Sequence, residues 1–222
     1  MNRTTAFLAT AALCAATSAP LSAGETGWHL RGFAAGHDSN LDLVAPAENP
    51  DEVRITSDSD LGFGASLEYQ FSNLFGLELG YMQASPTIEL IAEDVPGFGD
   101  IVLADSMSTS AITLDLNFHL TTNSQYFDLY LGAGVASMGY GNLHYVDPEG
   151  DPLDLNPSND VGYSAKAGLG IALGKNSKWA AIGGLRYIWT DLEASQAQDP
   201  DDTSATLDFN TSSFTVGIAY GF

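Results

Sequence analysis

The chain contains very little cysteine and very little positive charge. Its single cysteine, Cys14, lies near the N-terminus, so the rest of the chain has no disulfide or thiol chemistry. Only 7 lysines and arginines stand against 28 aspartates and glutamates, which gives a formal net charge of −21. A surface this acidic repels phosphate groups. Nucleic acid is therefore excluded as a partner.

Long apolar runs and helix-forming runs are also lacking. No stretch of about 18 apolar residues follows the N-terminal region, so no membrane-spanning helix is expected. The mean hydropathy is near zero, and the 23 glycines are accompanied by few runs of Leu, Ala, Glu and Lys. This composition favours an all-β protein with a single domain.

The first 23 residues have the features of a Sec signal peptide. Met1-Asn2-Arg3 forms a short cationic start, residues 6–16 are apolar and rich in alanine, and Leu21-Ser22-Ala23 offers a small-residue cleavage site. We therefore predict a signal peptide over residues 1–23 that is removed on export. Residues 24–222 are predicted to form one exported domain.

The end of the chain alternates strictly between two kinds of residue. In residues 212–222 the odd positions are small or polar, and the even positions carry Phe214, Val216, Ile218, Tyr220 and Phe222. This period of two indicates a β-strand with one apolar face, about as long as a tilted bilayer crossing. An apolar stripe that runs to a terminal aromatic is typical of outer-membrane barrels. We interpret Tyr220 and Phe222 as the assembly signal read by the barrel assembly machinery.

Seven further segments show the same alternation, and their connections alternate in length. The predicted strands cover residues 28–35, 61–71, 75–82, 111–120, 127–136, 161–173 and 179–189. Residues 72–73, 121–125 and 174–178 are short turns, whereas 36–60, 85–106, 141–160 and 190–209 are long and contain 23 of the 28 acidic residues. Short periplasmic turns and long extracellular loops are typical of a bacterial barrel. We predict an all-β, eight-stranded antiparallel up-and-down barrel that spans the cell outer membrane, with four long acidic loops.

The residues that alternate with the apolar ones along each strand should face the lumen. In an eight-stranded barrel the lumen is just wide enough for side chains to fill it. Eight of them are charged or titratable and should pair with one another: Arg31, Glu68, Glu78, Asp115, His119, Asp128, Lys166 and Arg186. Counting residues from the turns predicts two layers. Five residues form a layer near the periplasmic end, with Arg31 pairing Glu68, whereas Lys166, Arg186 and Asp115 lie higher. These charges are interpreted as a structural plug, or alternatively as a gate or solute site.

Other inward positions are apolar and suggest a path for apolar molecules. They are Phe33, Met82, Tyr130, Ile182 and Ile188. A continuous apolar path would suit a small hydrophobic solute that enters past the loops and leaves sideways into the bilayer.

Two motifs could carry other chemistry. His37-Asp38-Ser39-Asn40 matches a pattern of outer-membrane lipid A deacylases in which His activates Ser, although that family carries it in the C-terminal part of the barrel. Asp147-x-Glu149-x-Asp151 resembles the start of a calcium loop but is interrupted by prolines. We therefore predict no enzymatic activity, no cofactor and no specific metal site. The acidic loops are expected only to bind Ca²⁺ or Mg²⁺ weakly.

Several short segments resemble the outer-membrane protein W (OmpW) family. They include Leu74-Phe75-Gly76-Leu77-Glu78-Leu79, Tyr130-Leu131-Gly132-Ala133-Gly134, Trp189-Thr190-Asp191-Leu192-Glu193 and the closing Gly217-Ile218-Ala219-Tyr220-Gly221-Phe222. The similarity covers nearly the whole chain after the leader, at matching spacing. It implies an eight-stranded barrel whose mostly apolar interior is implicated in the passage of small hydrophobic molecules.

Two functions therefore remain open. The first is a passive channel or carrier for small hydrophobic molecules. The second is a non-transporting surface barrel that stabilises the envelope or binds partners through its acidic loops. In both cases the expected partners include outer-membrane lipids and lipopolysaccharide.

Overall fold

The computed structural model describes residues 26–40, 42–45, 53–95, 99–121, 124, 126–146, 150, 152–175, 177–196 and 204–222. The predicted signal peptide and the acidic residues of the Asp147-x-Glu149-x-Asp151 motif lie outside these residues. Within them, no helix is long and apolar enough to cross a bilayer.

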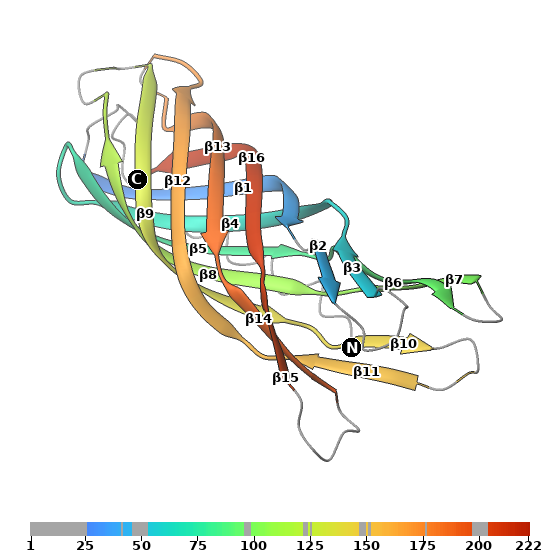
Figure 1. Cartoon of the computed structure of the whole chain (residues 1–222). Helices are drawn as coiled ribbons and strands as arrows, with labels where there is room; N and C mark the ends of the chain where they lie inside the picture. The colour runs from blue at the N-terminus through green and yellow to red at the C-terminus, as the bar shows by residue number, and fades with distance from the viewer. Residues whose placement is uncertain are drawn as a thin grey trace, which may run out of the picture.

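Eight long strands form a closed antiparallel barrel (Figure 1). They are β1 (Gly27–Asn40), β4 (Asp60–Gln70), β5 (Phe75–Ala84), β8 (Thr109–His119), β9 (Phe127–Tyr140), β12 (Asp160–Ala172), β13 (Trp179–Trp189) and β16 (Asn210–Gly221). The first strand pairs with both β4 and β16, and Trp28 and Phe222 exchange two backbone hydrogen bonds where the barrel closes. Closure pairs every strand on both sides, which a β-structure in a bilayer requires. The prediction of an eight-stranded barrel is confirmed.

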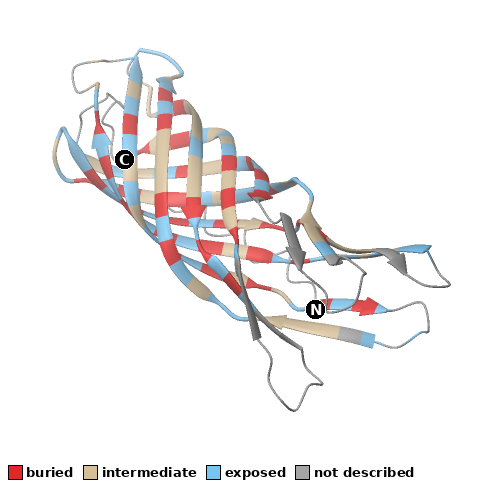
Figure 2. Ribbon diagram, viewed as in Figure 1, coloured by how far each residue is buried: buried red, intermediate tan, exposed pale blue. Residues whose placement is uncertain are grey.

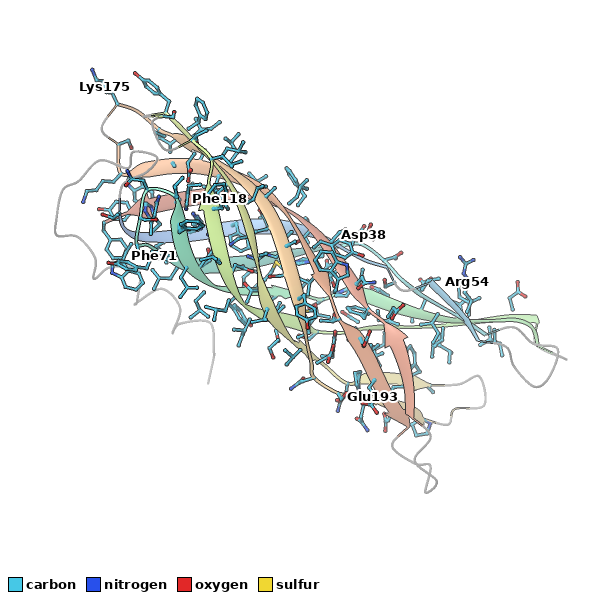
Figure 3. The ribbon with its side chains drawn as sticks, turned by 60° about the vertical axis from the view of Figure 1, so that its left-hand side comes forward. Asp38, Arg54, Phe71, Phe118, Lys175 and Glu193 are labelled. Atoms are coloured by element: carbon cyan, nitrogen blue, oxygen red, sulfur yellow. The ribbon has the colours of Figure 1, made fainter. Side chains whose placement is uncertain are left out.

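The strand faces alternate between an exposed apolar side and a buried side (Figure 2). Along β8, for example, Leu114 is 45% exposed and its neighbour Asp115 is fully buried. Aromatic side chains gather on the outer face near the short turns, where Trp28 packs on Tyr69 with ring centroids 4.8 Å apart. Figure 3 shows Phe71, Phe118 and Lys175 at this turn end, whereas Arg54 and Glu193 lie at the opposite, loop end.

The long connections are ordered into two four-stranded sheets that extend from the loop end (Figure 1). One sheet contains β2 (Asp42–Ala45), β3 (Val53–Ser57), β6 (Thr87–Val95) and β7 (Gly99–Ser106), and the other contains β10 (Leu143–Val146), β11 (Pro152–Pro157), β14 (Asp191–Gln196) and β15 (Ser204–Asp208). We expected only long polar loops here. Their short alternations, such as Ile88-Glu89-Leu90, are interrupted by acidic residues and prolines, which concealed the strands.

Within the described residues, the two sheets are linked where β10 lies beside β7. The backbone N–H of His144 in β10 donates to the carboxylate of Asp105 in β7, over a distance of 2.7 Å. On the other side, above the junction of β1 and β16, the outermost strands of the two sheets are β2 and β15. Among the described residues, no backbone pairing joins these two strands. In the described part of the chain, the links between the two sheets are therefore asymmetric.

The barrel strands are strongly staggered. Each residue in a barrel strand is paired with one residue in the next strand, so the pairs form a row around the barrel. The row that starts at Met138 on β9 returns to β9 at Asp128, which is ten residues nearer the turn end. Such an offset is a geometric condition for closing a tilted sheet into a barrel. Residues at equal distances from their own turns therefore need not lie at equal heights.

Bulky side chains and glycines alternate along part of this row. It runs through Met82, Gly64, Phe33, Gly217, Ile182 and Gly170. The Phe33 ring occupies the space above Gly64, where a Cβ atom would lie 2.5 Å from a ring carbon. A narrow lumen can hold large side chains because their neighbours have none.

Candidate functional site

The barrel interior contains two regions of different chemistry. The turn-side region, which we call the charged network, consists of the eight charged or titratable residues that the sequence places in the lumen. The structure places all eight inside the barrel, and Asp128, nearest the turn end, is the most exposed of them. The loop-side region, which we call the apolar interior, is a cluster of buried apolar side chains.

Arg31 joins two carboxylates that face each other across neighbouring strands. Glu68 on β4 is paired in register with Glu78 on β5, and each accepts a hydrogen bond from a different Arg31 nitrogen. Asn117 completes this group, because its amide nitrogen lies 2.6 Å from Glu68 Oε1 and 3.1 Å from Glu78 Oε2. Asn117 was not among the predicted site residues. Its inward position between Asp115 and His119 is the signal that could have revealed it.

His119 lies between two carboxylates. Its Nδ1 is 2.9 Å from Asp128 and its Nε2 is 3.1 Å from Glu68 Oε1. A carboxylate only accepts hydrogen bonds, so both contacts are satisfied when the ring carries a proton on each nitrogen. In that form, His119, Arg31, Lys166 and Arg186 balance the four carboxylates of the charged network.

Glu78 and Asp115 connect the remaining cations to this group. Lys166 Nζ lies 2.6 Å from Glu78 Oε1 and 3.3 Å from Asp115 Oδ2. The nearest Arg186 nitrogen lies 2.9 Å from Asp115 Oδ2 and 3.4 Å from Glu78 Oε1. The expectation of two separate layers is therefore wrong, because Glu78 contacts cations from both. The stagger of the strands brings together residues that counting from the turns had placed at different heights.

Tyr130 belongs with the charged network rather than with the apolar interior. Its ring lies under the guanidinium of Arg31, with 4.9 Å between Cζ and the ring centroid, and Lys166 Nζ is 5.8 Å away. Two small cavities, each of about 30 Å³, border the ring on its two sides. Each has room for about one or two water molecules. Side chains therefore fill the lumen at this level.

The apolar interior begins above this level and continues between the loop sheets. Met82 and Ile188 are buried in it and Phe33 packs against it, whereas Ile182 lies lower, beside the two small cavities. Its buried members are Ala35, Met82, Ile88, Met107, Ala111, Ala136, Met138, Tyr140, Leu143, Tyr145, Ile188, Leu192 and Phe209. Several come from the connections that were expected to be polar loops, and sequence reasoning missed them for that reason.

Tyr145 links the two loop sheets within the apolar interior. Its hydroxyl donates a hydrogen bond of 3.3 Å to the backbone carbonyl of Ile88. Burial raises the pKa of Tyr145 to about 12, so the phenol stays neutral under ordinary conditions. The sheets therefore meet through apolar packing and this neutral hydrogen bond, in addition to the bond from His144 to the carboxylate of Asp105.

The His37-Asp38-Ser39-Asn40 motif lies at the loop end of β1. His37 and Ser39 are buried, whereas Asp38 is exposed on the outer face (Figure 3). The Ser39 hydroxyl lies 2.8 Å from that of Ser57, which links the barrel wall to β3. Among the described residues, no group of three His, Cys, Asp or Glu side chains could hold a metal ion.

Comparison with known families agrees with this architecture. The outer membrane protein beta-barrel domain family matches residues 5–222. The chain belongs to this family. Membership indicates that it resides in the outer membrane. Together with the closed barrel of the structure, it confirms the recognition of the chain as an eight-stranded outer-membrane barrel. Comparison with curated proteins gives no match.

Solved structures of outer-membrane proteins have a similar fold. OprG from Pseudomonas aeruginosa is 18% identical, with a TM-score of 0.64 and coverage of 90% of this chain and 98% of OprG. AlkL, determined in lipid bilayers, is 15% identical, with a TM-score of 0.62 and coverage of 93% and 94%. Neisserial surface protein A is 13% identical, with a TM-score of 0.54 and coverage of 89% and 98%. At these identities the likeness concerns the fold alone.

Proposed function

We propose that this barrel is a passive route by which small hydrophobic molecules cross the outer leaflet of the outer membrane. The observation that carries the proposal is the change from an apolar interior at the loop end to a charged network at the turn end. An apolar molecule can dissolve among the loop-side side chains without displacing hydrogen bonds. It cannot enter the charged network without separating ion pairs, which is costly in a buried environment.

The asymmetry of the loop sheets supports a sideways exit. The apolar interior reaches Ala35 on β1, the strand that is followed by the sheet edge β2. A hollow of about 950 Å³ includes the next residue, Gly36, and the outward side chains of Leu61, Leu185 and Phe214, and it also borders Lys166 and Arg186 of the charged network. A solute that leaves over this side of the barrel would follow the outward apolar side chains to the lipid. The charged network would meanwhile keep the periplasmic end closed to water and ions.

Uptake of a hydrophobic fluorescent dye by cells tests the proposal. Cells that carry the wild-type barrel should take up the dye faster than deletion cells, which lack the barrel. Ile188→Asn places a polar amide in the apolar interior and should lower the rate by about fivefold or more. The matched control is Glu193→Gln, which alters an exposed loop-end residue and should leave the rate unchanged.

A second pair of variants separates the two regions. Glu68→Gln with Glu78→Gln keeps the side-chain sizes but removes the main anions around Arg31. Dye uptake should then barely change, because the proposed route avoids the charged network. Equal dye uptake by wild-type and deletion cells would refute the proposed function.

The second function, a surface barrel that does not transport, is favoured by one observation. The loop connections form ordered sheets rather than irregular chain, and their exposed acidic residues include Asp100 and Glu193. Such a surface could stabilise the envelope by weakly bridging lipopolysaccharide phosphates through Ca²⁺ or Mg²⁺. If deletion left dye uptake unchanged but made cells more sensitive to chelators, this second function would be preferred.

A further inference from the structure

The hollow of about 950 Å³ is a groove in the outer wall of the barrel. It crosses five neighbouring strands, β4, β1, β16, β13 and β12. At each strand it borders one inward residue together with the residues before and after it. The side chains of these flanking residues point outward, so they form the two walls of the groove, and the backbone between them forms its floor. The groove therefore faces the lipid of the outer membrane.

The two walls of the groove differ in polarity. The loop-side wall is polar, because it contains Asp38, Ser212 and Tyr187 in one row of paired residues. The turn-side wall contains only apolar side chains and one glycine. Its members are Leu61, Gly36, Phe214, Leu185 and Ala167. A polar wall above an apolar wall matches the boundary between lipid headgroups and acyl chains.

The groove is also inclined to the membrane. Because of the stagger, rows of paired residues descend towards the turn end in the order β4, β1, β16, β13 and β12. Asp38 on β1 therefore lies near the upper end of the groove, whereas Ala165 and Ala167 on β12 lie at its lower end, deeper in the bilayer.

Asp38 gives the upper end of the groove a negative charge. Its side chain is exposed, and it forms no ion pair with any described residue. Figure 3 shows it between Phe118 at the turn end and Arg54 at the loop end. A primary ammonium group has three N–H donors and forms strong, charge-assisted hydrogen bonds with a carboxylate. A headgroup with a net negative charge would instead be repelled.

We propose that this groove binds one outer-membrane lipid whose headgroup carries a primary ammonium group and no net charge. The ammonium pairs with Asp38, and one acyl chain descends along the groove past Leu185 to Ala165 and Ala167. Gly36 keeps the middle of the groove open, because a Cβ atom there would meet no atom within 4 Å. This site goes beyond the proposed function, since it concerns a lipid that stays bound rather than a solute that passes.

Retention of lipid by the purified barrel provides the first test. The wild-type barrel is reconstituted with equal amounts of phosphatidylethanolamine, phosphatidylglycerol and phosphatidylcholine that have the same acyl chains. It is then extracted into a mild detergent, and native mass spectrometry counts the lipids that remain bound. One phosphatidylethanolamine molecule should remain, with a preference of about fivefold over each of the other two lipids. Phosphatidylcholine has the same net charge but no N–H donor, so it separates hydrogen bonding from charge.

Three variants provide the second test. Gly36→Leu fills the groove and should lower phosphatidylethanolamine retention by about fivefold. Gly32→Leu is the matched control, because it adds the same side chain to the outer face of the same strand, outside the groove, where a Cβ atom also meets nothing within 4 Å. Asp38→Asn changes an exposed side chain at constant size and should abolish the preference for phosphatidylethanolamine. The folded fraction, measured by the gel mobility of unheated barrel, should be equal in all variants.

Two results would overturn the lipid site. The first is equal retention of the three lipids by the wild-type barrel, which would mean that lipid covers this wall without a specific site. The second is an unchanged preference in both Gly36→Leu and Asp38→Asn. The proposed function would stand in either case, because it is tested by dye uptake rather than by lipid retention.

Discussion

The two halves of the barrel interior solve the same packing problem with opposite chemistry. At the turn end, charged side chains fill the lumen, and each carboxylate is neutralised by a neighbouring cation or hydrogen-bond donor. At the loop end, alanines, methionines and aromatic residues fill the interior. The charged network fixes geometry, because moving one member leaves another unpaired. The apolar interior tolerates movement, because dispersion contacts are not directional.

The largest expected effect comes from removing the anion that links the charged network. Glu78→Ala takes away a carboxylate that contacts Arg31, Lys166 and Arg186. Loss of one partner from a buried ion pair should cost about 3–5 kcal/mol of stability. Urea unfolding of the barrel in lipid vesicles measures this loss. Glu193→Ala, at an exposed acidic position, is the control and should change stability by less than about 0.5 kcal/mol.

A truncation in the apolar interior should have a somewhat smaller effect. Ile188 is fully buried, so Ile188→Ala leaves a cavity and should cost about 2–4 kcal/mol in the same unfolding experiment. Its effect should not depend on salt concentration, because no charge is involved. A cost near zero would mean that the loop-end interior is not packed as described.

The alternation of bulky residues and glycines gives a third prediction. Gly64→Ala would place a Cβ atom 2.5 Å from both the Phe33 ring and the backbone carbonyl oxygen of Tyr81, which must move apart, at a cost of about 1–3 kcal/mol. Gly32→Ala is the matched control, since its Cβ would meet no atom within 4 Å. Equal stabilities of the two variants would contradict the inward packing of Phe33.

The smallest effect is expected where the loop sheets meet. Tyr145→Phe removes the hydrogen bond to Ile88 and should cost about 0.5–1.5 kcal/mol. The folded pKa of Tyr145 is raised to about 12, so this contribution should be constant below about pH 10 and lost as the pH rises towards 12. Comparison of the wild-type and Tyr145→Phe unfolding curves at several pH values checks both statements.

Much of this architecture could be predicted from the sequence because a barrel strand has a period of two. The alternation around Leu114 and Asp115 identifies one lipid-facing and one lumen-facing position without any tertiary information. The pairing of Glu68 with Glu78 also followed, because a tight turn fixes the register of a hairpin. The connection of Glu78 to Lys166 and Arg186 did not follow. It depends on the stagger around the whole barrel, which no single hairpin reveals.

The loop-end interior was harder to predict for a different reason. Met107 and Tyr145 lie in or beside short strands among acidic residues, where alternation over four or five residues is a weak signal. Their burial arises from packing between two sheets formed by segments far apart in the sequence.

The central claim is that the charged network closes the lumen to ions, and conductance across a planar bilayer tests it most directly. The wild-type barrel should give almost no ion current. The Glu68→Ala, Glu78→Ala double variant removes two side chains from the filled lumen, so it should conduct, and it should favour anions because Arg31, Lys166 and Arg186 would then face the lumen with fewer carboxylates. A large, steady current through the wild-type barrel would contradict the claim.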